Sequence, residues 1–456
     1  MSVRKFLFGL LLVVAVPAAF LCLNTRAVPQ GTPPSAAGEG LPLDPGVRFD
    51  LKGMNTCAGR SCHGRATESG GVRIQNDEFT KFLRQDKHAE AYRVLFSEQG
   101  QLICKNLGIL PRDKRCLACH TTPVSVMDEQ KTIKFSEEGV SCEACHGAAK
   151  AWFDPHKRPD FWRNRASIGT KGMRDLTDLG VRAQVCAGCH VGAPPSDDNR
   201  VPVRDMNHDL IAAGHPRLNF EFGAFLANLP KHWKEKDTEP GFESRAWAIG
   251  QVATAKAALE LLAHRAGPNE PCWPEFSEYD CYSCHHDLTA SKEGPGHLSW
   301  RQKRSGADRS LGVYSWGSWY YSLVPAALGE GDKTFSSDFK TLQKAMRKTY
   351  PNRDAVAQQA TSLAGNLGAW LTNADGKALN AATFNNLRGR LAGPDQKLVP
   401  IEEWDAATQL YLALMAFNAD AGDARLKDEL ERRRKELAFP PEFYSPSGFL
   451  PNALKP

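Results

Sequence analysis

The sequence Gly139-Val140-Ser141-Cys142-Glu143-Ala144-Cys145-His146-Gly147 holds two cysteines separated by two residues, and a histidine follows the second cysteine directly. The same C-x-x-C-H pattern recurs at three other places, Cys116–His120, Cys186–His190 and Cys281–His285. On a helix, side chains three residues apart lie on one face, about one turn from each other. The pattern therefore predicts four helical turns that each present two thiols and one imidazole.

Covalent attachment of haem c is the chemistry that needs this pattern. The two thiols add to the two vinyl groups on one edge of the porphyrin, and the histidine becomes the first axial ligand of the iron. A cofactor held by two covalent bonds stays attached even where little polypeptide surrounds it. The predicted attachment residues are Cys116, Cys119 and His120; Cys142, Cys145 and His146; Cys186, Cys189 and His190; and Cys281, Cys284 and His285.

A fifth attachment sequence is predicted at Cys57-Ala58-Gly59-Arg60-Ser61-Cys62-His63, where four residues separate the cysteines. The wider gap requires a bulged loop to present both sulfur atoms. Ala58, Gly59 and Ser61 are small enough to permit such a loop. The chain is therefore predicted to carry five covalently attached haems.

Zinc binding and a disulfide framework are the alternatives for a chain with 13 cysteines. Tetrahedral zinc sites are built from pairs of C-x-x-C units, which gives no reason for a histidine to follow each second cysteine. Disulfides between cysteines so close in sequence would close only very short loops. Cys104 and Cys272 lie outside the motifs, and a mutual disulfide, a free thiol and an iron-binding thiol stay open for them.

Eight of the 13 histidines remain after the five motif histidines are assigned, so every iron can take a second imidazole. Bis-histidine ligation closes the iron and favours electron transfer at low potential, whereas a methionine ligand would raise the potential. His208 and His215 are seven residues apart, which predicts two turns of one helix reaching two neighbouring irons. The predicted second ligands are His88, His156, His208, His215 and His286, with His232 in reserve.

The N-terminus has the pattern of an export signal. Arg4 and Lys5 precede an uninterrupted apolar stretch from Phe6 to Leu23. This stretch is longer than most signal cores and close to the roughly 20 residues that span a bilayer. We therefore predict a periplasmic or other extracytoplasmic protein, and both cleavage near Ala27 and retention as an inner-membrane anchor stay open.

The charge balance gives no support to nucleic-acid binding. The formal net charge is +5, of which Arg4, Lys5 and Arg26 in the N-terminal segment account for three. The remaining net charge of +2 is much smaller than the positive charge that nucleic-acid binding needs. We interpret it instead as compensation for the negative charges of haem propionates. The expected partners are other redox proteins or a quinol-linked electron donor.

Four segments are predicted along the chain: a signal peptide or anchor over residues 1–27, a flexible Pro- and Gly-rich linker over 28–50, a pentahaem domain over 51–300 and a helical domain over 301–456. The fold class is predicted to be mainly α, with short helices and loops around stacked haems in the pentahaem domain. A longer helix is predicted over residues 243–264, and apolar residues recur at helical spacing from Val356 to Trp370. The aromatic residues from Tyr314 to Tyr321 are interpreted as core packing.

Three segments resemble the cytochrome c-554 family: Asp86 to Tyr92, Gly139 to Gly147, and Asn207 to Glu221. The resemblance covers roughly residues 50–290 and extends more loosely to multihaem relatives that oxidise hydroxylamine or reduce tetrathionate. It implies a mostly helical periplasmic protein whose haems stack in alternating near-parallel and perpendicular pairs. The chain departs from the four-haem pattern of this family in its haem count, its opening spacing and its long C-terminal extension, which leaves the physiological partner open.

These features favour an electron carrier, in which a chain of bis-histidine haems passes electrons between redox partners. Two alternatives stay open: an oxidoreductase with one open haem that acts on a small nitrogen or sulfur compound, and a haem-containing scaffold within a larger complex. The histidine surplus permits closed irons without requiring them. No catalytic residue is predicted.

Overall fold

The computed structural model describes residues 50–67, 75–122, 135–163, 168–196, 201–233, 239–281, 284, 314–317, 319–329, 333–373, 381–392, 404–435 and 437. Within these residues the regular structure is helical, apart from the isolated bridges Ala193–Arg204 and Tyr279–Trp316. The predicted mainly α fold class is confirmed. The predicted signal segment, nearly all of the linker, and His285 and His286 lie outside the described residues.

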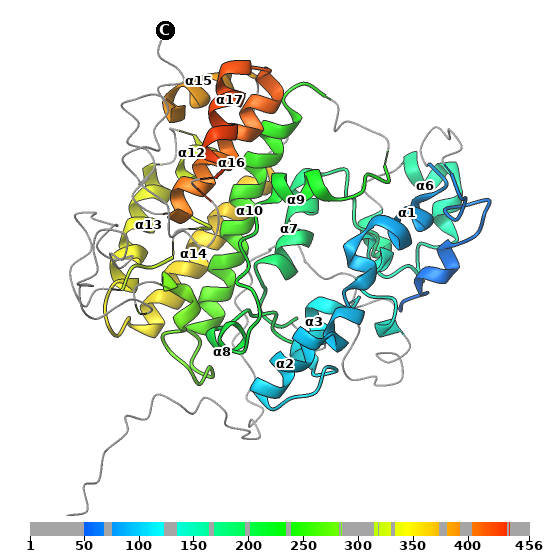
Figure 1. The fold of residues 1–456 in the computed structure, drawn as a ribbon, viewed down its shortest axis with the longest axis horizontal. Coiled ribbons are helices and arrows are strands. Elements are labelled where there is room, and N and C mark those ends of the chain that lie inside the picture. The colour runs from blue at the N-terminus through cyan, green and yellow to red at the C-terminus, as the bar shows by residue number, and fades with distance from the viewer. Residues whose placement is uncertain are drawn as a thin grey trace, which may run out of the picture.

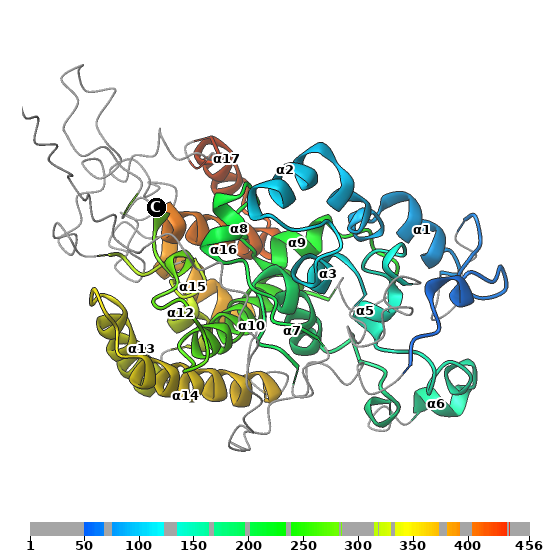
Figure 2. The same cartoon turned by 90° about the horizontal axis from the view of Figure 1, so that it is seen from below.

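Long helices gather on one side of the molecule and short helices on the other, as Figure 1 and the view from below in Figure 2 both show. The long-helix side consists of α10 (Phe242–Arg265), α12 (Val324–Leu328), α13 (Lys333–Met346), α14 (Arg353–Thr372), α15 (Ala381–Ala392), α16 (Trp404–Ala421) and α17 (Ala424–Arg433). The short-helix side consists of α1 (Glu78–Gln85), α2 (Glu98–Leu107), α3 (Lys114–His120), α5 (Cys142–His146) and α6 (Pro159–Arg163). Between them lie α7 (Leu179–His190), α8 (His208–Ala212) and α9 (Phe222–Asn228).

Short 3₁₀ helices connect several of these elements on the motif-bearing side. They are η2 (Met54–Cys57), η3 (Lys87–Glu90), η4 (Arg93–Phe96), η5 (Pro155–Lys157), η7 (Gly169–Lys171) and η9 (Phe276–Glu278). Single 3₁₀ turns of this kind serve as connectors because their hydrogen-bond geometry does not support long runs. This part of the chain is thus built from brief turns, as expected around large cofactors.

Helix α10 forms the centre of the long-helix side. The helix predicted over residues 243–264 is confirmed, with one further residue at each end. Trp247, Leu259 and Leu262 are fully buried, and buried residues occur on every side of the helix. Neighbouring helices therefore surround α10, which explains why small residues such as Gly250 are needed: a Cβ there would lie 2.6 Å from Cβ of Phe222 in α9.

One apolar core joins α7, α9 and α10 to the C-terminal helices α12–α17. The apolar residues of α14 that recur at helical spacing, from Val356 to Trp370, are all buried in this core, which confirms the predicted helix. Trp316, Trp319 and Tyr321 belong to the same core, so the interpretation of the aromatic cluster as packing is also confirmed. The core crosses residue 300, where we predict a domain boundary, and the boundary itself stays a prediction.

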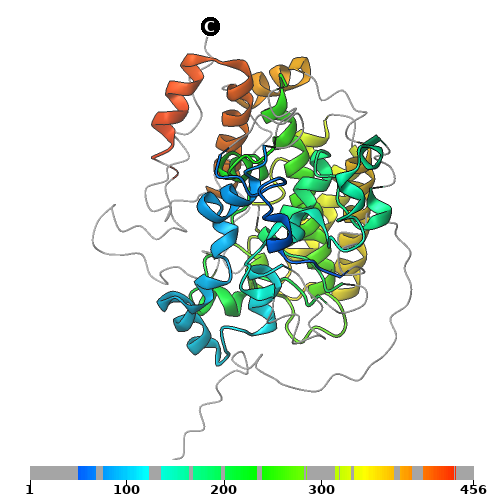
Figure 3. The ribbon, with the colours of Figure 1, turned by 90° about the vertical axis from the view of Figure 1, so that its right-hand side faces the viewer.

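Within the part of the chain that the structure describes, the motif-bearing side has two small apolar clusters of its own. One is formed by Ala149, Trp152, Phe161 and Ile168, and the other by Tyr92, Leu95 and Leu117. Figure 3 shows the blue and cyan elements of this side in front of the long green and yellow helices. Clusters of this size bury too little apolar surface to order so many residues, which leaves a structural role for bound cofactors. In the described part of the chain, no helix is long and apolar enough to cross a membrane.

Candidate haem-binding sites

Three of the C-x-x-C-H motifs occupy helical turns that end at the histidine. Helix α3 ends at His120, α5 extends from Cys142 to His146, and α7 ends at His190. The helical turn places the two thiols of each motif on one face, as the spacing predicts. We number the attachment sites 1 to 5 in chain order, so that these three motifs form sites 2, 3 and 4.

Site 1, which includes Cys57, Cys62 and His63, is a compact loop rather than a helix. The backbone N–H groups of Cys62 and Gly64 both donate to the carbonyl of Gly59, at 2.8 and 3.1 Å, and this closes the loop. A Cβ at Gly64 would lie 1.9 Å from the carbonyl oxygen of Ala58. The absence of a side chain at Gly64 thus permits the bulge that a four-residue gap requires, whereas a Cβ at Gly59 would make only an ordinary contact, 3.6 Å from Sγ of Cys62.

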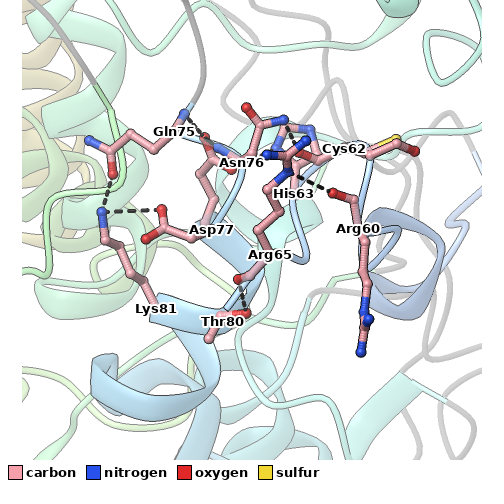
Figure 4. Close-up of polar contacts among 11 residues, drawn as sticks. Arg60, Cys62, His63, Arg65, Gln75, Asn76, Asp77, Thr80 and Lys81 are labelled. Atoms are coloured by element: carbon pink, nitrogen blue, oxygen red, sulfur yellow. Dashed lines mark hydrogen bonds and ion pairs between the residues drawn. The ribbon is translucent and has the colours of Figure 1, made fainter. Parts of the chain in front are cut away.

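The segment from Gln75 to Lys81 holds this loop in place (Figure 4). The side-chain amide of Asn76 donates to the carbonyl of Cys62 at 2.8 Å, and the hydroxyl of Thr80 donates to the carbonyl of Arg65 at 2.7 Å. The backbone N–H of Phe79 donates to the carbonyl of His63 at 2.9 Å. The start of α1 therefore fixes both the second cysteine and the histidine of site 1.

Each described motif histidine lies opposite one histidine from outside the motifs. The ring centres are separated by 6.5 Å for His63 and His156, 6.3 Å for His120 and His215, 6.4 Å for His146 and His232, and 6.0 Å for His190 and His88. Two imidazoles that bind opposite sides of one metal ion through bonds of about 2 Å have ring centres about 6 Å apart, since each centre lies a further ~1 Å behind its nitrogen. These four pairs therefore have the separation of axial ligands.

Hydrogen bonds orient most of these imidazoles. Nδ1 lies within hydrogen-bonding distance of a carboxylate in His63 and His88, with Glu78 at 3.1 Å and Asp86 at 2.9 Å. Nδ1 of four other rings lies beside a backbone carbonyl: His120 beside Ala91, His156 beside Phe153, His215 beside Pro216 and His232 beside Pro230. A proton on Nδ1 leaves Nε2 free as the ligating atom, which is the tautomer that a metal site of this kind selects.

Burial keeps two of the motif histidines neutral. It lowers the pKa of His146 to about 3 and that of His190 to about 4. A neutral imidazole has the lone pair that iron ligation requires, so the protein environment favours the binding form. The hydrogen bond that His63 donates to Glu78 raises the pKa of His63, and the one that His88 donates to Asp86 raises the pKa of His88.

Contacts between thiols show which sites are neighbours. The Cys57 thiol is in hydrogen-bonding contact with Cys142, and Cys119 with Cys189. Cys145 lies close enough to Cys186 and Cys189 to interact with both electrostatically. Site 1 therefore adjoins site 3, site 3 adjoins site 4, and site 4 adjoins site 2.

The predicted second ligands are placed as follows. His88, His156 and His215 each face a motif histidine, whereas His286 lies outside the described residues. His208 begins α8 beside η9, with its backbone N–H 2.8 Å from Oε1 of Glu275 and its ring centre 5.8 Å from that of Phe276. Phe276 belongs to η9, which two residues separate from Cys281 of site 5.

The prediction that His208 and His215 share one helix is wrong. Helix α8 ends at Ala212, and Gly214 has φ +115°, a conformation that only glycine adopts readily. His215 therefore points to its partner from a turn beyond the helix. The sequence Gly214-His215-Pro216 already contained this signal, because glycine and proline commonly follow the end of a helix.

His232, which the sequence analysis kept in reserve, faces the motif histidine of site 3. It lies in the loop after α9, where its ring packs edge-on against Trp233 at 5.1 Å and faces His146. Arg182 of α7 stacks over Trp233 at 5.0 Å and ties this loop to the helix that carries site 4. The adjacent aromatic residue was the available signal, since it anchors the loop.

Of the three cysteines outside the motifs, the two that the structure describes do not pair with each other. Cys272 is disulfide-bonded, whereas Cys104 is a buried free cysteine whose thiol contacts Cys116 of site 2. Of the options left open by the sequence, a mutual disulfide is thus wrong and a free thiol is correct for Cys104. His264 has Nε2 3.2 Å from Oε1 of Glu270.

The donor set of sites 1 to 4 fits haem c. Each site combines two cysteine thiols, which form thioethers with a porphyrin, and two imidazoles at the separation of axial ligands. Haem c supplies one-electron redox chemistry when it is bound. The fold and these sites define a c-type cytochrome, a helical electron-transfer protein with covalently bound haem c.

Part of the chain matches the cytochrome c554 family. Residues 56–147, which contain the cysteines and motif histidines of sites 1, 2 and 3, match the family described as "Cytochrome c554 and c-prime". No curated protein and no solved structure matches the chain. The match confirms the resemblance over residues 56–147, whereas sites 4 and 5 lie outside the matched segment.

Proposed function

We propose that the chain is an exported pentahaem cytochrome that passes electrons between redox partners through bis-histidine haems. The observation that carries this proposal is the set of four histidine pairs. Each pair supplies two strong ligands to one iron, so sites 1 to 4 have no open position for a small molecule. An enzyme acting through one of these four haems would have to displace a histidine first.

The contacts between neighbouring sites support electron transfer along the molecule. Attachment thiols of sites 1 and 3, of 3 and 4, and of 4 and 2 lie close together, which gives the order 1, 3, 4, 2. Cofactors attached at such neighbouring cysteines would lie near one another. Their spacing then suits successive electron transfers, and no substrate pocket is needed between them.

We propose His208 as the second ligand at site 5. Its position beside η9 puts it near the chain segment that leads into Cys281 and Cys284. Arg217 lies close enough to Cys281 to interact with it electrostatically, and its guanidinium also pairs with Asp405 at 3.2 Å. This assignment gives every attachment site a histidine from outside the motifs.

The export signal pattern places the protein outside the cytoplasm in this proposal, where c-type haem is attached. Retention of the apolar N-terminal segment would hold the cytochrome at the inner membrane, close to a quinol-linked donor. Cleavage would release it to shuttle between soluble redox proteins. Both arrangements fit the same redox role, and mass spectrometry of the mature N-terminus distinguishes them.

Mass spectrometry and EPR of the purified holoprotein test the proposal. We expect a mass increase of five haems over the polypeptide and five low-spin ferric centres. A polypeptide without haem, and without Soret absorbance after maturation in a competent host, would contradict it. Five haems with one high-spin centre that binds cyanide or nitric oxide would instead favour the oxidoreductase with an open haem.

A further inference from the structure

Two of the axial histidines differ from the others in the group that faces Nδ1. His63 of site 1 faces the carboxylate of Glu78, and His88 of site 4 faces the carboxylate of Asp86. At site 2, both His120 and His215 face backbone carbonyls instead. A full negative charge and a neutral dipole act differently on a metal ligand, so the sites are not electronically equivalent.

The Glu78 carboxylate is held firmly beside His63. Glu78 is the first residue of α1, and its second oxygen accepts hydrogen bonds from the backbone N–H groups of Gln75 and Asn76, at 2.5 and 3.2 Å. The side chain is only 13% exposed. Because the segment Gln75–Lys81 also binds the loop of site 1 (Figure 4), the carboxylate and the imidazole are parts of one rigid unit.

Asp86 is fixed by its own turn. It precedes η3, and Oδ1 accepts the backbone N–H of His88 at 2.9 Å as well as facing Nδ1 of the same residue. Its side chain is only 9% exposed, so water screens its charge weakly. The sequence Asp86-Lys87-His88 therefore encodes both the turn and the carboxylate partner.

A carboxylate that accepts the Nδ1 proton makes the imidazole a stronger electron donor to its metal. Stronger donation and a nearby negative charge both favour the ferric state, which carries one more positive charge than the ferrous state. We propose that Glu78 and Asp86 are positioning residues that lower the reduction potentials at sites 1 and 4 below that at site 2. This inference rests on the proposed haem ligation and ranks the sites by their reduction potentials.

Other charged groups near the axial histidines also affect the reduction potentials of the sites. Asp86 and Glu78 both interact electrostatically with His232 of site 3. Arg174 and Arg182 act in the opposite sense on His146 of the same site. Site 3 therefore experiences charges of both signs. Site 2, with carbonyls at both imidazoles, is the clearer reference for comparison.

Glu78→Gln and Asp86→Asn test the proposal, because each keeps the shape of the side chain and removes its charge. The matched control is Glu90→Gln, because Glu90 of η3 is exposed and pairs with Arg93 of η4. The readouts are haem content by mass spectrometry and the potential of each low-spin centre by EPR-monitored redox titration. We expect five low-spin haems in all three variants.

Glu78→Gln should raise the potential of site 1 most, with a smaller rise at site 3, because Glu78 also interacts electrostatically with His232. Asp86→Asn should raise that of site 4, with a smaller rise at site 3, and Glu90→Gln should change none. Unchanged potentials in fully loaded Glu78→Gln and Asp86→Asn would overturn the inference and leave the proposed function intact. A wild-type protein without haem would overturn the proposed function itself.

If Glu78→Gln loses its haem, Glu78→Asp provides the second measurement, because it keeps the charge with a shorter side chain. A loaded Glu78→Asp variant with the wild-type potential at site 1 supports the inference. A haem-loaded Glu78→Asp variant in which the potential of site 1 equals that of site 2 overturns the inference. The carboxylate charge would then have no effect of its own on the potential.

Discussion

The proposed function depends on single histidines, and the sequence identifies the motif histidines better than the histidines that face them. Motif histidines follow from local chemistry, because the thiols and the imidazole must lie on one short segment. Their partners follow from tertiary structure: His88 precedes His190 by about a hundred residues, whereas His232 follows His146 at a similar distance. No spacing rule connects such pairs, which is why His232 could not be ranked above His286 from the sequence.

Replacing His88 by alanine should convert one low-spin centre to high spin, because His190 would lose its opposite ligand. The change should appear in EPR and in the visible spectrum, with haem content unchanged. His264→Ala is the matched control, since this histidine pairs with Glu270 and faces no motif histidine within the described residues. An unaltered spectrum in fully loaded His88→Ala would remove His88 from the ligands.

Ring orientation should make site 1 distinguishable by EPR. The imidazole planes of His63 and His156 are nearly parallel, at 11°, whereas those at sites 2, 3 and 4 are nearly perpendicular, at 82°, 71° and 77°. The relative orientation of axial ligands sets the splitting of the iron orbitals. We expect one rhombic low-spin signal from site 1 and signals with a larger maximum g value from sites 2 to 4, and His156→Ala should abolish the rhombic signal alone.

At the scale of helices, predictions succeeded where apolar residues recur over several turns. Helices α10 and α14 were predicted on this basis, and both are present. The short elements of the haem region were harder, because one or two turns contain too few residues to define a period. Helix α8 illustrates the limit: Gly214 ends the helical path, although the seven-residue spacing of His208 and His215 suits a helix.

Removing the side chain of Trp247 should destabilise the long-helix side. This residue of α10 is fully buried and packs edge-on against Phe417 of α16 at 4.8 Å. Trp247→Ala should lower the free energy of unfolding by about 3–5 kcal/mol, the usual cost of truncating a large buried side chain. Denaturant unfolding measures the change.

Met415→Ala on α16 is the control for this measurement. Its side chain is 41% exposed, so the free energy of unfolding should change by no more than about 0.5 kcal/mol. Equal effects of the two substitutions would contradict the assignment of α10 to the centre of the core.

For the whole molecule, the haem attachment sequences were predictable but their spatial order was not. Sites adjoin in the order 1, 3, 4, 2, because helices α5 and α7 and the loop of site 1 fold back on one another. Chain order alone would have suggested 1, 2, 3, 4. The division at residue 300 was drawn from the loss of cysteine and histidine, whereas the apolar core follows a different pattern and continues across it.

Changing Cys281 and Cys284 together to serine should remove one haem and leave four. Sites 1 to 4 take their histidine pairs from residues 63 to 232, so their low-spin signals should persist. Mass spectrometry and EPR check both expectations. Five haems in this variant would show that site 5 lies elsewhere in the sequence.

Helix α10 has a consequence for how the protein is made. The helix is buried on nearly all sides, yet α14 and α16, which cover much of it, are synthesised only after about a hundred further residues. A nascent chain that has been synthesised as far as α10 therefore exposes apolar surface to aggregation and proteolysis until its C-terminal partner helices are made. Shortened versions that stop near residue 300 should consequently aggregate or be degraded, even though they retain every cysteine that binds porphyrin.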